Sequence, residues 1–144
     1  MTTAPTTGFS LPVRGVKVYS RQTLTACVPT YGRVELDFEP VTEGTASSCE
    51  FACIAEPEPA AEFERALVQG VLRELAAEDS DNPEARRGSP VRARVVVRAL
   101  SWHWTDSCEQ VFIRLGALAV REALHCVAEG REPKAIETRV RLFF

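Results

Sequence analysis

The stretch Tyr31-Gly-Arg-Val-Glu-Leu-Asp-Phe-Glu-Pro40 alternates apolar and charged side chains. In an extended chain the charged side chains fall together on one side, namely Arg33, Glu35, Asp37 and Glu39. A period of two residues is typical of a β-strand that buries one face. The stretch therefore predicts a strand whose apolar face, made by Val34, Leu36 and Phe38, lies on the core.

The same period recurs in the segments on either side of this strand. Val16 and Val18 alternate with Lys17 and Tyr19, which predicts a preceding strand. After the turn-forming residues 44–48, a third strand is predicted, with one face made by Cys49, Phe51, Cys53 and Ala55. The sequence Pro57-Glu-Pro59 is expected to end that strand, because proline cannot donate to a sheet ladder.

The period changes to that of a helix after Ala60. Large apolar residues then recur every four positions, at Phe63, Leu67, Val71 and Leu75. This spacing predicts an amphipathic helix with one buried face. Residues 78–90 are charged and rich in residues that break helices and strands, which predicts an exposed loop.

The end of the chain repeats this succession of strand and helix. Residues 91–98 alternate again, with apolar Val91, Ala93, Val95 and Val97 set against Arg92, Arg94 and Arg98. Asp106 and Glu109 have the spacing of a capping box, which predicts the start of a second long helix. Its buried face is predicted to contain Phe112, Leu115, Ala119, Ala123 and Cys126. Residues 136–144 are predicted to form a last strand.

The order of elements, three strands, helix, strand, helix, strand, predicts an α+β fold. We expect a two-layer sandwich in which both helices cover one face of a mixed sheet of four or five strands. Residues 13–144 are expected to form a single domain. Residues 1–12 are rich in threonine and proline and are expected to be a disordered tail.

Charge and cysteine content restrict the classes of function. The 17 basic and 20 acidic residues give a formal charge of −3, which excludes a uniformly basic nucleic-acid coat protein. Any contact with RNA must then come from a local patch. The N-terminal residues do not read as a signal peptide, and the longest apolar stretches, 91–100 and 115–120, are too short to span a bilayer.

The five cysteines are an odd number without C-x-x-C spacing. We therefore expect a reduced, cytoplasmic protein with no membrane contact. Cys49 and Cys53 are four residues apart on one strand, about 13 Å, too far to share a zinc ion without a bend. His125 and Cys126 are adjacent on a helix and diverge. No metal site and no cofactor are expected.

Several segments resemble the fourth domain of translation elongation factor G and of the tetracycline ribosomal protection proteins. The segments are Val18-Tyr19-Ser-Arg21, residues 31–40, Glu50-Phe51, the helix portion Ala66–Gly70, and Trp102-His103-Trp-Thr-Asp106-Ser107-Cys-Glu109. Together they extend over residues 14 to 128. The resemblance implies a sheet backed by two helices with a left-handed β-α-β crossover, an exception to the usual rule.

What the resemblance implies for function is a free-standing module that contacts the ribosome or RNA. The chain has no G-x-x-x-x-G-K-[ST] phosphate loop, so no GTPase activity is expected. In the family, two loops at the tip of the domain enter the ribosomal decoding region. The segment at the first loop here, residues 23–30, is shortened and has neither glycine nor positive charge. It is open whether this shortening abolishes ribosome binding.

The second tip loop is therefore the first candidate site. It contains Trp102, His103, Trp104, Thr105 and Ser107. Aromatic surfaces there can stack on unpaired bases, while His103 and the following helix N-terminus meet a phosphate. The alternative interpretation is that one tryptophan caps the core and His103 is merely exposed.

The second candidate is the outward-facing row of Arg92, Arg94 and Arg98. With Lys17, Arg139 and Arg141 it can produce a positive field on the helix-free face of the sheet. The alternative is that these cations pair with the outward carboxylates of the 31–40 strand. The same open face can also be buried in a homodimer or against a protein partner.

A third candidate comes from a different class of function. Cys108 near a helix N-terminus, with His103 and Asp106 close in sequence, is a possible nucleophile site of a small tailoring enzyme or small-molecule-binding protein. Catalytic groups normally come from distant segments, and Asp106 is better explained as a helix N-cap. The preferred hypothesis is a non-enzymatic module that binds RNA, the ribosome or a protein.

Overall fold

The computed structural model describes residues 7–9, 12–20, 31–52, 60–77, 90–102 and 107–138. Its elements are β1 (Thr7–Gly8), β2 (Val13–Ser20), β3 (Gly32–Glu39), β4 (Ser48–Phe51), α1 (Ala61–Leu75), β5 (Val91–Arg92), β6 (Arg94–Ser101), α2 (Glu109–Glu129) and β7 (Ile136–Thr138). Cys53, Ala55, residues 78–89 and residues 139–144, for which a strand face, a loop and a strand were predicted, lie outside the described residues.

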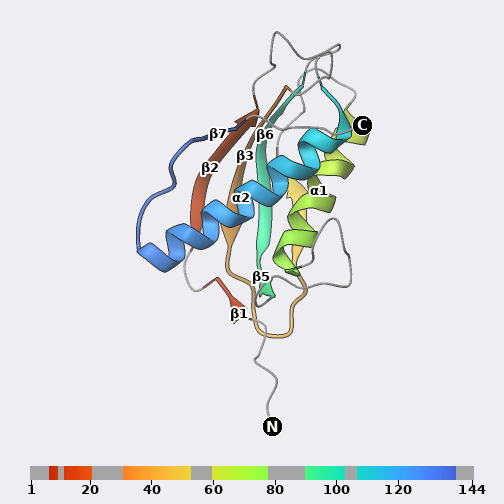
Figure 1. The fold of residues 1–144 in the computed structure, drawn as a ribbon. Coiled ribbons are helices and arrows are strands. Elements are labelled where there is room, and N and C mark those ends of the chain that lie inside the picture. Colours follow the sequence, from red (N-terminus) through yellow and green to blue (C-terminus); the bar gives the residue numbers. More distant parts are fainter. Residues whose placement is uncertain are drawn as a thin grey trace.

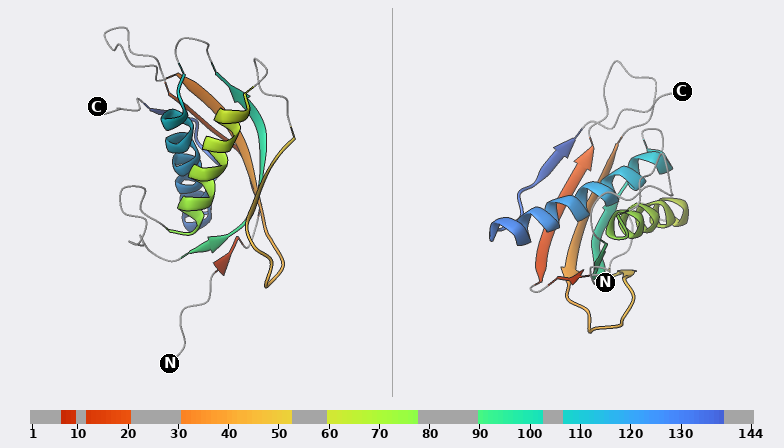
Figure 2. Two further views of the ribbon diagram at one scale, coloured as in Figure 1. Left: turned by 90° about the vertical axis from the view of Figure 1, so that its right-hand side faces the viewer. Right: turned by 60° about the horizontal axis from the view of Figure 1, so that its bottom comes forward.

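The described strands form a five-stranded mixed sheet in the order β4-β6-β3-β2-β7 and a two-stranded pair, β1 with β5. β3 is antiparallel to both of its neighbours, whereas β4 is parallel to β6 and β7 is parallel to β2. Both helices cover the same face of the large sheet (Figure 1; Figure 2, left). The predicted two-layer α+β sandwich is confirmed.

The crossover from β4 through α1 to β6 is left-handed. In Figure 1 the helices lie in front of the sheet and β6 runs upward, with its parallel neighbour β4 on its right. The chain descends through α1 toward the viewer and returns to the sheet one position to the left. A right-handed unit would step to the right, so the fold departs from the rule that nearly all such crossovers obey. α2 then carries the chain further left, from β6 to β7.

The apolar face predicted for residues 31–40 is buried as expected. Val34, Leu36 and Phe38 are fully enclosed between the sheet and the helices. α1 contributes its four predicted residues, Phe63, Leu67, Val71 and Leu75, and α2 contributes its five, Phe112, Leu115, Ala119, Ala123 and Cys126. The alternation of the strands and the period of the helices thus identified the core correctly.

The start of α2 differs from the predicted capping box. The helix begins at Glu109, and its N-cap is Cys108, whose backbone is extended at φ −147° and ψ 165° and whose side chain makes no capping hydrogen bond. Glu109 is therefore the first helical residue, not the third. Ser107 explains the late start, because its Oγ donates a 2.8 Å hydrogen bond to the Tyr31 carbonyl and so holds the chain against the start of β3.

Part of the predicted N-terminal tail is ordered. Thr7 and Gly8 pair in parallel with Val91 and Arg92. Phe9 is buried, and its ring stacks on Phe38 with a centroid distance of 5.6 Å. Within the expected disordered tail of residues 1–12, residues 7–9 therefore contact the fold, and burial of the aromatic ring of Phe9 favours this contact.

The two helices cross at a pair of glycines. A Cβ atom on Gly70 of α1 would lie 2.0 Å from the backbone oxygen of Ile113 in α2. A Cβ atom on Gly116 of α2 would lie 2.8 Å from the backbone oxygen of Leu67. The helix backbones are therefore in direct contact, which no residue larger than glycine permits at either position.

A buried carboxylate fixes the chain beyond α2. Glu122 is 4% exposed and accepts two hydrogen bonds from the Arg131 guanidinium, at 2.7 and 3.1 Å, and one from the backbone N–H of Lys134 at 2.9 Å. The hydrogen bond from Arg131 lowers the pKa of Glu122 to about 2, against the opposing effect of burial. These bonds hold the connection to β7 against the helix end.

We predict that Gly70→Ala destabilises the protein although alanine is the better helix former. Propensity alone favours alanine by about 1 kcal/mol, but overpacking at a backbone contact costs about 1–3 kcal/mol or more. Urea unfolding should give a net loss. Gln69→Ala, on the exposed side of α1, is the control and should leave stability nearly unchanged. A more stable Gly70→Ala variant would contradict the crossing geometry.

We predict that the Glu122 interaction is lost in acid. Its folded pKa of about 2 lies below the ordinary 4.5, so its stabilisation is complete above pH 4.5 and disappears as the pH falls toward 2. Glu122→Gln should lower the free energy of unfolding at pH 7 by about 2–3 kcal/mol. The difference between wild type and variant should shrink between pH 4.5 and 2. A difference independent of pH would refute the ionised pair.

Candidate functional site

The predicted tip lies where β6 ends and α2 begins. Trp102, Ser107 and Cys108 are described there, whereas His103, Trp104, Thr105 and Asp106 lie outside the described residues. The two ends of this segment are held by different contacts. Trp102 packs on the helices, and Ser107 is hydrogen-bonded to the carbonyl at the start of β3. The segment between them therefore starts and finishes at fixed points.

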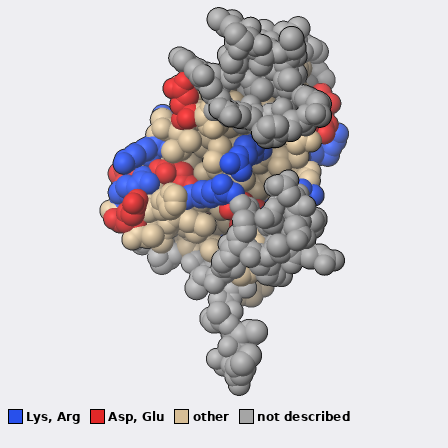
Figure 3. Space-filling view, viewed as in Figure 1, with Lys and Arg blue, Asp and Glu red and all other residues tan. Residues whose placement is uncertain are grey.

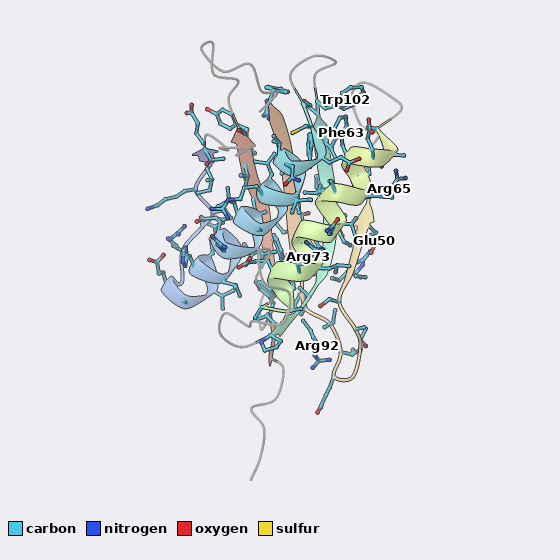
Figure 4. All side chains as sticks on the ribbon, turned by 45° about the vertical axis from the view of Figure 1, so that its right-hand side comes forward. Glu50, Phe63, Arg65, Arg73, Arg92 and Trp102 are labelled. Carbon is cyan, nitrogen blue, oxygen red and sulfur yellow. The ribbon has the colours of Figure 1, made fainter. Side chains whose placement is uncertain are left out.

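Trp102 belongs to the core. It is 7% exposed, and its ring lies 4.8 Å from the ring of Phe63, which in turn lies 5.1 Å from that of Phe112. Figure 4 shows Trp102 and Phe63 together at the end of the molecule where β6 stops. The prediction that Trp102 offers a stacking surface for bases is therefore wrong, because the faces of its ring are covered by protein. The alternative, that one tryptophan caps the core, describes it.

The N-terminus of α2 adjoins this segment. Its N-cap side chain makes no hydrogen bond to the first turn, and Glu109 is the acidic residue in that turn. Backbone N–H groups at a helix start carry a partial positive charge that favours anions. The Glu109 carboxylate already benefits from it, which weakens the attraction for an external phosphate.

Cys108 is half-buried and packs against the hydrophobic core. Its proposed partners, His103 and Asp106, are outside the described residues, so the geometry of that catalytic group stays untested. The environments of the other two described thiols, Cys49 and Cys126, favour a structural role. Burial raises the pKa of Cys49 to about 12, and burial followed by the Glu122 carboxylate raises the pKa of Cys126. Both thiols are kept protonated, unlike nucleophilic cysteines.

Two arginines of the row on the open face of the sheet form ion pairs with carboxylates. Arg98 donates to Asp37 at 2.8 Å, and Arg94 donates to Glu50 of β4. The hydrogen bond from Arg94 lowers the pKa of the Glu50 carboxyl. Arg92 instead donates to the backbone carbonyls of Thr42 and Thr45, at 3.4 and 3.1 Å. These contacts match the ion-pair alternative and not a free positive field.

Two further cations on the same face are paired in the same way. Arg14 bonds to Glu39 at 3.0 Å, and Lys17 lies 3.7 Å from Glu35. Arg139 and Arg141 lie outside the described residues. The sequence correctly supplied the carboxylates of residues 31–40, but it did not identify Glu50, because the parallel register of β4 with β6 cannot be read from alternation.

Asp37, one of the outward carboxylates that the sequence offered as partners for the arginines, is a buried charge. It is 7% exposed and accepts hydrogen bonds from Arg98 and, at 2.9 Å, from the backbone N–H of Gly15. Gly15 has a φ of +73°, and the β2–β3 register shifts there. The sequence signal for this bulge was Gly15, which directly precedes the alternating Val16 and Val18, since glycine permits the backbone conformation that a bulge requires.

Among the described residues, no group of His, Cys, Asp and Glu side chains has an arrangement that could hold a metal ion. In the same part of the chain, no helix has the length and apolar character needed to cross a membrane.

No protein-family model and no curated protein sequence matches this chain. Among solved structures, the chain is similar to a crystal structure from Thermus thermophilus, with a TM-score of 0.53 and 20% sequence identity. The match covers 77% of this chain but only 15% of the other, so this chain corresponds to a small part of that protein. The likeness shows a shared fold.

We predict that Trp102→Ala acts on stability. Removing a buried aromatic side chain from this position should cost about 3–5 kcal/mol in the free energy of unfolding. Trp102→Phe, which keeps a ring against Phe63, should cost much less. Thermal and urea unfolding of the two variants would measure this, and a Trp102→Ala variant as stable as wild type would place the indole outside the core.

Proposed function

We propose that this chain is a non-enzymatic module that binds RNA, in the setting of the ribosome, through the end of the sheet where β6 passes into α2. The proposal combines the resemblance of residues 14 to 128 to the fourth domain of elongation factor G with the form of this end of the molecule. The observation that carries it is the left-handed two-layer fold, whose β6–α2 segment starts on buried Trp102 and finishes on hydrogen-bonded Ser107.

The held ends matter because a segment fixed at both sides loses less conformational freedom on binding. Trp102 acts as the base of the tip, so Trp104 is left as the indole for base stacking, with His103 and Thr105 beside it. The ion pairs on the open sheet face favour the tip over that face, because paired arginines release little free energy on meeting phosphate.

The catalytic alternative at His103, Asp106 and Cys108 receives less support. The Cys108 side chain packs on the core, and the residue occupies the N-cap position of α2. A homodimer or protein partner on the open sheet face is also less favoured, because that face presents paired charges and not an apolar centre.

The test is co-sedimentation of the protein with ribosomes at about 50 mM salt, where electrostatic attraction is screened least. Trp104→Ala should weaken association about 5- to 150-fold, the equivalent of about 1–3 kcal/mol of stacking, with the fold intact. His103→Ala should weaken it less. Val127→Ala, at an exposed site near the far end of α2, is the control. Absence of ribosome or RNA binding by the wild type would refute the proposed function.

A further inference from the structure

The helix layer has four arginines, most of which form no ion pair with another described residue of the protein. They are Arg65 and Arg73 of α1 and Arg114 and Arg121 of α2, and we call them the helix-face arginines. Figure 3 views this side of the molecule and shows basic atoms over the middle of the helix layer, with most acidic atoms nearer its edges. Figure 4 shows Arg65 and Arg73 projecting from the two ends of α1.

Three of these arginines have no carboxylate partner among the described residues. Arg65, Arg73 and Arg114 take part in none of the ion pairs found there, whereas Arg121 bonds to Glu74 across the two helices at 3.1 Å. On the open sheet face, Arg14, Lys17, Arg94 and Arg98 each have an acidic partner, whereas Arg33 takes part in none of these ion pairs.

Helix geometry explains the contrast. A helical side chain meets the residues three and four positions away. The residues four positions from the helix-face arginines are all without negative charge: Ala61, Gln69, Ala77, Gln110, Leu118, Ala117 and His125. Arg65 has Glu62 three positions before it, but the two form no ion pair. The sequence therefore gives these arginines no carboxylate four positions away, and Glu62 is the one carboxylate three positions away.

The spacing of the arginines is set by a rigid scaffold. Arg65 and Arg73 are two helical turns apart, about 12 Å, and Arg114 and Arg121 are about 10 Å apart along α2. The contact of α1 and α2 at Gly70 and Gly116 fixes one pair relative to the other. Because the backbone positions from which the arginines extend are fixed, only side-chain freedom is lost when they bind an extended anion.

We propose that the helix-face arginines form a second binding surface, which contacts the phosphate backbone of double-helical RNA. The surface lacks the apolar centre expected for a protein partner: the one large hydrophobic residue exposed in the described part of the chain is Val127, near the end of α2. Polar, arginine-rich surfaces are typical of nucleic-acid interfaces. The inference rests on the proposed RNA-binding function, but it uses a surface separate from the tip.

The test measures binding of the full chain to a fluorescent RNA duplex of about 20 base pairs over a salt series. The triple variant Arg65→Gln, Arg73→Gln, Arg114→Gln should bind at least about tenfold more weakly at about 50 mM salt. Its slope of log affinity against log salt should be smaller by about 2–3, because each phosphate contact contributes about 0.7–0.9. The triple lysine variant, which keeps the charges, should retain most of the binding.

The matched control is Arg14→Gln, Lys17→Gln, Arg33→Gln, which removes the same charge from the open sheet face. It should keep both the affinity and the slope of the wild type. An equal loss of RNA affinity in the control and the helix-face variants would refute the proposed surface, because it would show that only the net charge of the protein matters. Tighter binding to poly-glutamate than to the duplex would overturn it in favour of an acidic protein.

The outcomes separate this inference from the proposed function. If the wild type binds RNA, the helix-face triple variant binds equally well and Trp104→Ala binds more weakly, the second surface is refuted and the tip remains the binding site. A wild type that binds neither ribosomes nor duplex RNA refutes both. Circular dichroism melting of each variant confirms that the fold is retained, and single substitutions replace any triple variant that unfolds.

Discussion

The backbone contact between α1 and α2 is the constraint on which the helix layer depends. Gly70 and Gly116 let each helix approach the main chain of the other, and their missing side chains determine how close the axes can come. This crossing places the ring of Phe63 in α1 against that of Phe112 in α2. The ring of Phe63 also contacts that of Trp102. The end of β6 and the start of α2 are therefore positioned by a contact in the middle of the helices, some distance along the chain.

Charge divides the molecule into two unlike faces. On the open side of the sheet, adjacent strands bring opposite charges within reach of each other, so Asp37 and Arg98, or Glu50 and Arg94, neutralise each other. On the helix layer each arginine depends mainly on neighbours along its own helix. In the described part of the chain, the crossing offers one ion pair between helices, Glu74 with Arg121, because the remaining contact surface is apolar or glycine.

Much of the fold could be predicted from the sequence, because period is a local property. Val34, Leu36 and Phe38 alternate, and Phe63, Leu67 and Val71 recur as a helix requires, so their burial followed directly. The features that escaped prediction depend on distant partners. Ser107 delays the start of α2 by binding to Tyr31, and Phe9 is ordered by Phe38, neither of which a local pattern contains.

The candidate site was less predictable for the same reason. Trp102 and Trp104 are two residues apart in similar surroundings in the sequence, and only the position of Phe63 assigns Trp102 to the core. That assignment also restricts the proposal for function. The buried indole of Trp102 fixes the point at which the tip segment starts, and the glycine crossing fixes the two helices relative to each other. If both surfaces contact RNA, they favour folded RNA that offers unpaired bases next to a duplex, because the tip segment leads directly into α2, which carries two of the helix-face arginines.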